Sequence, residues 1–193
     1  MQRLHKQLGA DGYQVVRSND QWPDHQARAL VTGSMVAWMH PHTVIDPACG
    51  DLSIVRAAHA LKPIEFVQAN DISIPQMADH WGKDYGFRCA LTTKDAFDFL
   101  MDAEYADLIV LTEILEHLEE PVELLKLARM RASHLVVSSP IDEEPGRGNH
   151  EHVWSFSEDD YLGMLRESGW SPVAFHRLEF VPRYYDFQLF ACV

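Results

Sequence analysis

The sequence predicts an α/β protein built on a doubly wound, mainly parallel β-sheet with helices on both faces. Short apolar runs alternate along the chain with segments of helical periodicity, and glycines and prolines separate them. Such alternation is typical of parallel sheets covered on both sides. The chain has 193 residues, of which 47% are apolar and 23% are charged. A globular chain of this length buries roughly 70% of its unfolded surface.

The first elements follow from local signals. Residues 1–42 are expected to supply a helix that begins at Trp22-Pro23-Asp24 and ends before His40-Pro41-His42, with apolar residues at helical spacing. Residues 43–46 then read as a short buried strand, 47–51 as a tight turn and 52–61 as a helix with one apolar face. Strand, turn and helix make up the first repeating unit of the sheet.

The remaining elements repeat this pattern and end in an antiparallel pair. The expected strands are 64–70, 87–91, 108–111 and 135–138, and the helices between them are 73–82, 96–101 and 121–131. A long loop, 140–155, precedes a helix at 157–169, and strands 173–180 and 185–192 have a connection short enough only for antiparallel neighbours. We expect one domain, 1–193, with an N-terminal helical segment, 1–42, and a core, 43–193.

The charge and cysteine content narrow the function classes. With 16 Lys and Arg against 29 Asp and Glu, the formal charge is −13, which disfavours nonspecific binding to nucleic acid or anionic lipid. The three cysteines contain no C-x-x-C pair. No apolar run has the length of a signal peptide or approaches the ~20 residues of a membrane span. We expect a cytoplasmic protein without membrane contact, and the oligomeric state stays open.

The turn after the first strand is the first place to look for a ligand. In open parallel sheets, ligands bind outside the carboxyl ends of the strands, near the point where strand order reverses. That turn runs from Asp46 to Leu52, and the second strand ends in Asp71. An acidic side chain there can accept hydrogen bonds from both hydroxyls of a ribose.

Several segments resemble, in chain order, the motifs of one enzyme family. VIDPACGDLS and QANDIS resemble motif I and the acidic second-strand motif of the class I S-adenosylmethionine-dependent methyltransferases. Lys94-Asp95-Ala96, ADLIVLTEILEHL, HLVVSSP and HVWSFSEDDYLGMLRESGW resemble the adenine-contacting turn, the fourth strand, the fifth strand and the sixth helix. The resemblance implies a Rossmann-like sheet of seven strands, the last antiparallel, and methyl transfer from S-adenosylmethionine.

The resemblance also implies a cofactor site. Asp46, Ala48 and Gly50 would lie against the methionine part, Asp71 would hold the ribose, and Asp95 and Ala96 would contact the adenine. Neighbouring positions complete the expected set, namely Cys49, Ile72 and Thr112. Family members usually have glycine where this chain has Ala48 and Leu52. A protein that keeps the fold and binds a partner or nucleotide without catalysis is therefore an alternative.

A second group of side chains follows the fourth strand. If Glu113-Ile114-Leu115-Glu116-His117 turns helically, Glu113, Glu116 and His117 share one face. Two carboxylates and an imidazole suit Mg²⁺ or Mn²⁺, and also Fe²⁺, Co²⁺ or Zn²⁺. This E-x-x-E-H segment resembles the metal site of quinone-biosynthesis O-methyltransferases and small-RNA 3′-terminal 2′-O-methyltransferases. In the latter a further histidine follows the fifth strand, for which His152 is our first choice and His150 the second.

The expected reaction is methyl transfer to an oxygen of a small-molecule or terminal hydroxyl acceptor, with Glu113 and His117 as catalytic residues. The alternatives are a segment without metal, in which the glutamate serves the pocket, and a 2′-hydroxyl of RNA as acceptor. Acidic loop residues would repel a phosphate-rich substrate, which favours a small molecule. The candidates for acceptor recognition are Asp142, Glu143, Glu144, Arg147, Arg183 and Tyr184.

Overall fold

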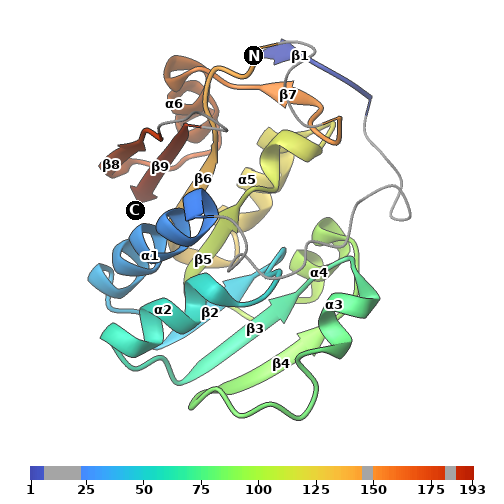
Figure 1. The fold of residues 1–193 in the computed structure, drawn as a ribbon, viewed down its shortest axis with the longest axis vertical. Coiled ribbons are helices and arrows are strands. Elements are labelled where there is room, and N and C mark those ends of the chain that lie inside the picture. The colour runs from blue at the N-terminus through green and yellow to red at the C-terminus, as the bar shows by residue number, and fades with distance from the viewer. Residues whose placement is uncertain (7–22, 145–149, 181–185) are drawn as a thin grey trace.

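The computed structural model describes residues 1–6, 23–144, 150–180 and 186–193. Its main sheet has seven strands in the order β4-β3-β2-β5-β6-β9-β8 (Figure 1). The strands are β2 (Thr43–Asp46), β3 (Phe66–Asn70), β4 (Arg88–Thr92), β5 (Ala106–Thr112), β6 (Ala132–Pro140), β8 (Pro172–Leu178) and β9 (Phe187–Cys192). β2 to β6 pair in parallel, and β9 is antiparallel to both β6 and β8. The predicted fold class, with its last strand antiparallel, is confirmed.

Helices cover both faces of this sheet. α1 (Pro23–Trp38), α2 (Ser53–Leu61) and α3 (Ile74–Ala78) contribute to one core, and α4 (Ala96–Asp102), α5 (Pro121–Arg129) and α6 (Glu158–Glu167) contribute to the other. β5 lies between the two cores: Leu108 and Val110 face the first, whereas Ile109 and Leu111 face the second. All four side chains are fully buried because successive strand residues point to opposite faces.

Three features depart from the expected elements. α3 ends at Ala78, earlier than the predicted end near Gly82. A 3-10 helix, η3 (Leu115–His117), stands where a longer helical turn was expected. A second sheet has two strands, β1 (Gln2–Arg3) and β7 (Trp154–Ser155), and β7 lies within the segment that was predicted to be a long loop. Strands of two residues are too short to leave a periodic pattern in the sequence.

The parallel register sets the position of the functional edge. Val44 of β2 is aligned with Val67 of β3 and with Leu108 of β5, so these strands run side by side in the same direction. Their carboxyl ends therefore meet at one edge of the sheet. None of the helices among the described residues is both long and apolar enough to cross a membrane.

Candidate functional site

The turn between β2 and α2 is held to the end of β3 by backbone hydrogen bonds. Gly50 has a φ of 51°, in the left-handed region that glycine adopts without a Cβ clash. Its N–H donates to Asp71 Oδ2 over 3.0 Å, and Ser73 N–H donates to Asp71 Oδ1 over 2.9 Å. Burial raises the pKa of Asp71, although these two backbone donors act to lower it. Asp71 thus sets the position of Gly50 relative to the start of α3.

Leu52 occupies the next special position of this turn. Its φ is 59° although it is a leucine, and its side chain is fully buried in the core beneath α1 and α2. A left-handed conformation costs a non-glycine residue about 1–2 kcal/mol. The burial of the leucine side chain offsets that cost, since burying such a side chain gains about 1.5–3 kcal/mol. The turn therefore holds Leu52 in a left-handed conformation, at a position where members of the family that the sequence resembles usually have glycine.

Asn70 links this turn to the one after β4, and the sequence analysis did not single it out. Its Nδ2 donates to the carbonyls of Pro47 and Lys94 at 3.0 and 2.9 Å. Its Oδ1 accepts from Lys94 N–H at 2.8 Å and from Thr92 Oγ1 at 2.9 Å. All four hydrogen-bonding positions of the amide are filled. The signal available in the sequence was an asparagine directly before the predicted ribose-binding aspartate.

The other predicted cofactor residues lie around the same edge. Asp95 is exposed and caps α4 by accepting from Phe97 N–H at 2.8 Å. Ile72 is 40% exposed, whereas Cys49 is buried with its thiol against the sulfur of Met77 at 3.6 Å. The side chain of Cys49 therefore faces the core. The remaining predicted residue of the turn, Ala48, is half-buried. Ala96, the first residue of α4, and Thr112, the last residue of β5, are both buried.

Asp46 ends β2 beneath this turn and is only 2% exposed. Burial raises its pKa to about 8, against its ordinary 3.8. A hydrogen bond from Ala48 N–H acts to lower the pKa, and the nearby carboxylates of Asp71 and Asp51 raise it further. A carboxyl group that is protonated near neutral pH thus lies at the floor of the site.

Glu113 does not belong to one helical turn with Glu116 and His117, contrary to the expectation. Its φ is 52°, and η3 begins only at Leu115, so the i, i+3, i+4 relation of an α-helix does not apply. Its Oε1 accepts from Ser138 Oγ at 3.0 Å and lies 3.8 Å from Nη1 of Arg28. A strained backbone at the end of a central strand is a common feature of functional sites.

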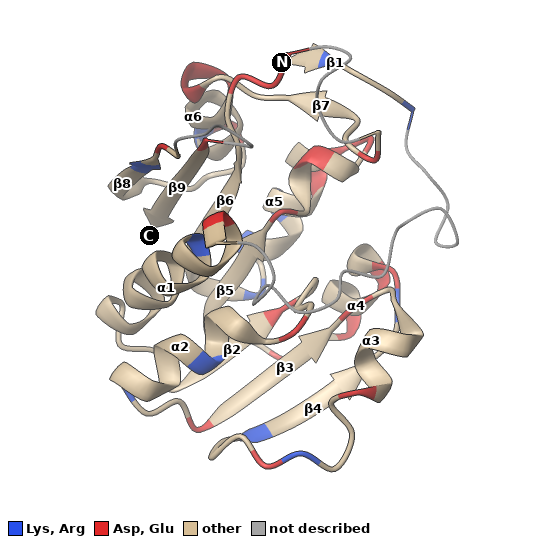
Figure 2. Ribbon diagram, in the orientation of Figure 1, with Lys and Arg blue, Asp and Glu red and all other residues tan. Residues whose placement is uncertain are grey.

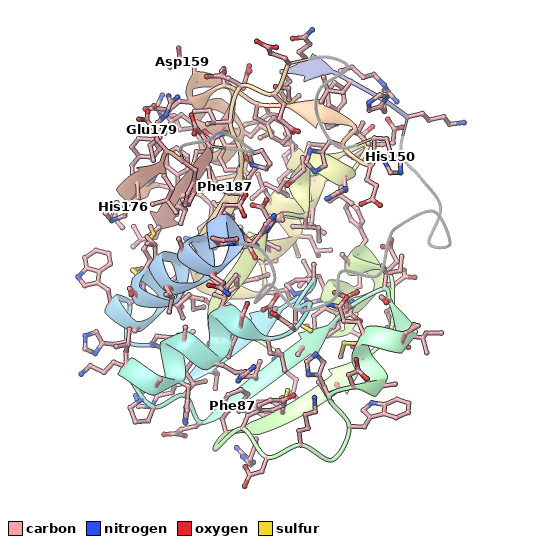
Figure 3. All side chains as sticks on the ribbon, viewed as in Figure 1. Phe87, His150, Asp159, His176, Glu179 and Phe187 are labelled. Carbon is pink, nitrogen blue, oxygen red and sulfur yellow. The ribbon has the colours of Figure 1, made fainter. Side chains whose placement is uncertain are left out.

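Glu116, His117 and His152 do converge, each offering a ligand atom within 4.8 Å of the others. The backbone brings the two segments together, because Val153 N–H donates to the carbonyl of Glu116 at 2.6 Å. The two imidazole rings are in edge-to-face contact, with centroids 4.7 Å apart. His150, the second choice, is exposed and lies outside this group (Figure 3).

Both rings are hydrogen-bonded at Nδ1. His117 Nδ1 donates to the carbonyl of Glu151 at 3.0 Å, and His152 Nδ1 lies 2.6 Å from Oε2 of the buried Glu143. Burial, followed by the charge of His152, lowers the pKa of His117 to about 3, so its ring is neutral. With Nδ1 protonated, the lone pair of the His117 ring is on Nε2. Metal-binding histidines have this arrangement, with the other ring nitrogen donating to a carbonyl or carboxylate.

The Glu116 carboxylate is fully buried and its two oxygens have no hydrogen-bond partner among the residues that the structure describes. Burial, together with the charge of Glu113, raises its pKa well above the ordinary range. Leaving a buried carboxylate without partners is costly. A carboxylate and two imidazoles, of which His117 has its lone pair on Nε2, would remove this cost by binding a divalent cation, and they fit such an ion chemically.

Comparison with solved structures identifies the fold. Magnesium protoporphyrin IX methyltransferase from Synechocystis PCC 6803 matches with a TM-score of 0.68 and 19% identity, over 95% of this chain and 90% of that one. N-methyltransferase NodS from Bradyrhizobium japonicum WM9 also gives 0.68, at 17% identity, over 90% and 97%. This chain has the class I methyltransferase fold. The methyltransferase domain of bacterial CtHen1-C matches with a TM-score of 0.65 at 16% identity, over 88% and 98%.

No model of a known protein family matches the chain, and no curated protein matches it. Within the class I methyltransferase fold, the turn at Gly50 and the group at Glu116 occupy the edge where the sequence analysis placed the cofactor and the acceptor. Figure 2 shows acidic segments on the turns that follow β2 and β5.

Arg28 of α1 is a buried cation at this edge that the sequence analysis missed. It is 4% exposed, stacks over the ring of Phe187 at 5.5 Å and faces Glu113. Its Nε and Nη1 have no hydrogen-bond partner within the described ranges. Figure 3 shows Phe187, at the start of β9, beside α1. The sequence does not indicate that Arg28 is buried, because a single arginine in a helix with both polar and apolar residues is usually exposed.

The candidates for acceptor recognition fall into three groups. Asp142 and Glu144 are exposed, and Asp142 has a left-handed φ of 52°. Glu143 is instead buried against His152 and supports the histidine. Arg147, Arg183 and Tyr184 lie outside the described residues.

Proposed function

We propose that the protein is an S-adenosylmethionine-dependent methyltransferase that acts on a hydroxyl oxygen of a small acceptor. The observation that carries this proposal is the position of two groups at one sheet edge: the Gly50–Asp71 turn, and the convergent Glu116, His117 and His152. Neighbours of the same fold were solved with bound S-adenosylhomocysteine or S-adenosylmethionine, which supports the same cofactor here.

The cofactor's polar groups have partners available in this turn. Each oxygen of the Asp71 carboxylate accepts one backbone hydrogen bond and retains further acceptor capacity for ribose hydroxyls. The methionine part carries a carboxylate, and Arg28 presents two guanidinium nitrogens, Nε and Nη1, without hydrogen-bond partners among the described residues, Nη1 lying 3.8 Å from Glu113 Oε1. We assign Arg28 to that carboxylate, because a paired guanidinium is stabilised by charge-assisted hydrogen bonds. Ala48, Gly50, Asp95 and Ala96 would shape the rest of the pocket.

The acceptor is expected beside Glu113 and the three-residue group. Transfer forms a bond between the acceptor oxygen and the methyl carbon and breaks the bond between that carbon and sulfur, so the acceptor's proton must leave. A divalent ion bound by Glu116, His117 and His152 would lower the pKa of the acceptor hydroxyl and orient it. A ring whose pKa is about 3 is a weak base at neutral pH, so His117 suits the role of ligand better than that of proton acceptor. Glu113 remains the candidate base.

One observation favours a second acceptor class, the terminal 2′-hydroxyl of RNA. His152 reaches the group from beyond the fifth parallel strand, as in the small-RNA methyltransferases that the sequence resembles. The net charge of −13 disfavours it, since RNA binding draws much of its affinity from cationic side chains. We therefore place a small molecule first.

Calorimetry with S-adenosylhomocysteine, with and without Mn²⁺ or Mg²⁺, tests the proposal. We expect micromolar binding of S-adenosylhomocysteine and a separate heat for the metal ion. Glu116→Gln should abolish the metal heat and leave S-adenosylhomocysteine binding intact, because an amide is a poor substitute for a charged ligand. Glu120→Gln, at an exposed carboxylate of the same segment, is the matched control and should retain both.

Each outcome has a distinct meaning. If millimolar S-adenosylhomocysteine gives no heat, the methyltransferase assignment is wrong and a binding protein that has kept the fold replaces it. If Glu116→Gln binds the ion as well as the wild type does, the metal assignment is wrong while the cofactor assignment stands.

A further inference from the structure

Both sides of the Gly50 peptide are held from distant parts of the chain. Its N–H donates to Asp71, and its carbonyl accepts a hydrogen bond from Nε2 of His80 at 2.8 Å. His80 follows α3 and is only 5% exposed. The sequence analysis gave His80 no role, and the proposed cofactor contacts do not include it.

The hydrogen bond of His80 to the Gly50 carbonyl determines which tautomer the neutral ring adopts. A carbonyl only accepts, so Nε2 must carry the proton in the bond to Gly50. In the neutral ring Nδ1 is then an acceptor, and it lies 2.6 Å from the hydroxyl of Tyr85. Burial raises the pKa of Tyr85, so this hydroxyl is protonated and able to donate. The result is a directed chain from the Tyr85 hydroxyl through the His80 ring to the Gly50 carbonyl.

Tyr85 is itself held in place. Its ring stacks on Phe87 with centroids 5.6 Å apart and an interplanar angle of 19°, and the guanidinium of Arg56 lies 5.8 Å from its centroid. Figure 3 shows Phe87 among the side chains by β4. Contacts with Phe87, directly before β4, and with Arg56 of α2 therefore orient the hydroxyl that orients His80.

The direction of the Gly50 carbonyl also decides where the next N–H points. A trans peptide is planar, so fixing the carbonyl of Gly50 toward His80 turns the N–H of Asp51 the opposite way. The residues on either side of Asp51, Gly50 and Leu52, both have left-handed φ values.

We propose that His80, oriented by Tyr85, is a positioning residue for cofactor binding: it fixes the Gly50–Asp51 peptide in the orientation that receives the methionine part of the cofactor. This inference rests on the proposed function. His80 acts through the peptide and is not expected to touch the cofactor or the acceptor. Its loss should therefore weaken binding at the methionine end and leave the adenosine end little changed.

The test compares two probes, S-adenosylhomocysteine and 5′-methylthioadenosine, which lacks the amino-acid part. For His80→Ala we expect about a tenfold rise in the Kd of S-adenosylhomocysteine, the effect of losing one hydrogen bond to the half-buried Gly50 carbonyl. The Kd of methylthioadenosine should change less than threefold. His80→Gln should restore most of the affinity, because its amide nitrogen lies about as far along the side chain as Nε2 and can donate to the same carbonyl.

Two further variants separate positioning from general destabilisation. Tyr85→Phe removes only the hydroxyl and should give a smaller rise in the same Kd, with the thermal midpoint close to that of the wild type. His59→Ala removes a neighbouring histidine that accepts from Ile64 N–H at 3.0 Å and contacts Phe87. It should lower the thermal midpoint without changing either Kd.

The inference is overturned if His80→Ala weakens both probes equally, or neither, or if His80→Gln binds no better than His80→Ala. If His80→Ala does not fold, the same two probes on His80→Gln and Tyr85→Phe decide: unchanged S-adenosylhomocysteine affinity in Tyr85→Phe overturns the role of the chain from Tyr85. If the wild type binds neither probe, the proposed function fails first.

Discussion

Asp46→Asn should remove one component of the pH dependence of stability between pH 5.5 and 7.5, the component due to the Asp46 carboxyl. Asp46 is 2% exposed, and burial raises its pKa to about 8, against 3.8 ordinarily. Because the folded-state pKa is the higher one, the folded protein keeps a proton that the unfolded chain releases above pH 3.8. The stability from this proton is complete below pH 3.8 and is lost as the pH rises through about 8.

The magnitude follows from the width of that window. Each pH unit between the unfolded-state pKa of 3.8 and the folded-state pKa of about 8 lowers the unfolding free energy by about 1.4 kcal/mol, so two units lower it by up to about 2.7 kcal/mol. Asparagine keeps an oxygen for the N–H of Ala48 but does not titrate. The difference in unfolding free energy between Asp46→Asn and wild type should therefore shift in favour of the variant by up to that amount from pH 5.5 to 7.5.

Urea unfolding at pH 5.5, 6.5 and 7.5, without cofactor or divalent ions, measures this difference. Asp107→Asn is the matched control. Burial acts to raise the pKa of Asp107, but backbone N–H groups of Thr43 and His42 outweigh it and lower the pKa. Its titration therefore affects stability only near and below pH 3.8. A difference between Asp46→Asn and wild type that stays constant over the three pH values would refute the buried, protonated carboxyl.

Two other variants, Arg28→Met and Gly33→Ala, test the cofactor site and the packing between helices α1 and α2, with Gly163→Ala as a control for the second. Arg28→Met should raise the Kd of S-adenosylhomocysteine about 10- to 100-fold and leave that of 5′-methylthioadenosine unchanged. The reason is that it would remove the proposed charged hydrogen bond to the carboxylate of the methionine part. Equal losses of affinity for both probes would contradict the assignment of Arg28 to that carboxylate. Gly33→Ala should lower the unfolding free energy by about 1–3 kcal/mol, since its Cβ would lie 2.7 Å from Ala57 Cβ and 2.9 Å from the carbonyl of Ile54. Gly163→Ala, with nothing within 4 Å, should instead be neutral or stabilising in the same urea titration.

The sequence analysis worked best where a signal is local or depends on chain order. A short apolar run, 108–111, predicted β5, and the structure buries both of its faces because strand geometry sends successive side chains to opposite sides. Gly50 and Asp71 were placed together because the ends of adjacent parallel strands meet at one edge. The ordered motifs then predicted the sheet of seven strands with an antiparallel last strand, which the structure confirms.

It worked least well where backbone conformation changes within a few residues. The segment from Glu113 to His117 reads as one helical turn, but Glu113 has a left-handed φ and only Leu115–His117 form a 3-10 helix. Periodicity assumes one repeating conformation, so it grouped Glu113 with Glu116 and His117, whereas the residues that converge are Glu116, His117 and His152. The cofactor and metal roles given to these residues stay predictions.

By itself the sequence determined the order of strands and helices, the fold class and the edge at which the expected site residues gather, because these follow from hydrophobic periodicity and chain connectivity. Only the tertiary structure decided which side chains meet there. Arg28 beside Glu113, His80 on the Gly50 carbonyl and Glu143 on His152 are contacts between separate segments. Such contacts depend on how the helices and loops pack over the sheet edge. They join residues far apart in the chain, so they produce no regular pattern in the sequence that could predict them.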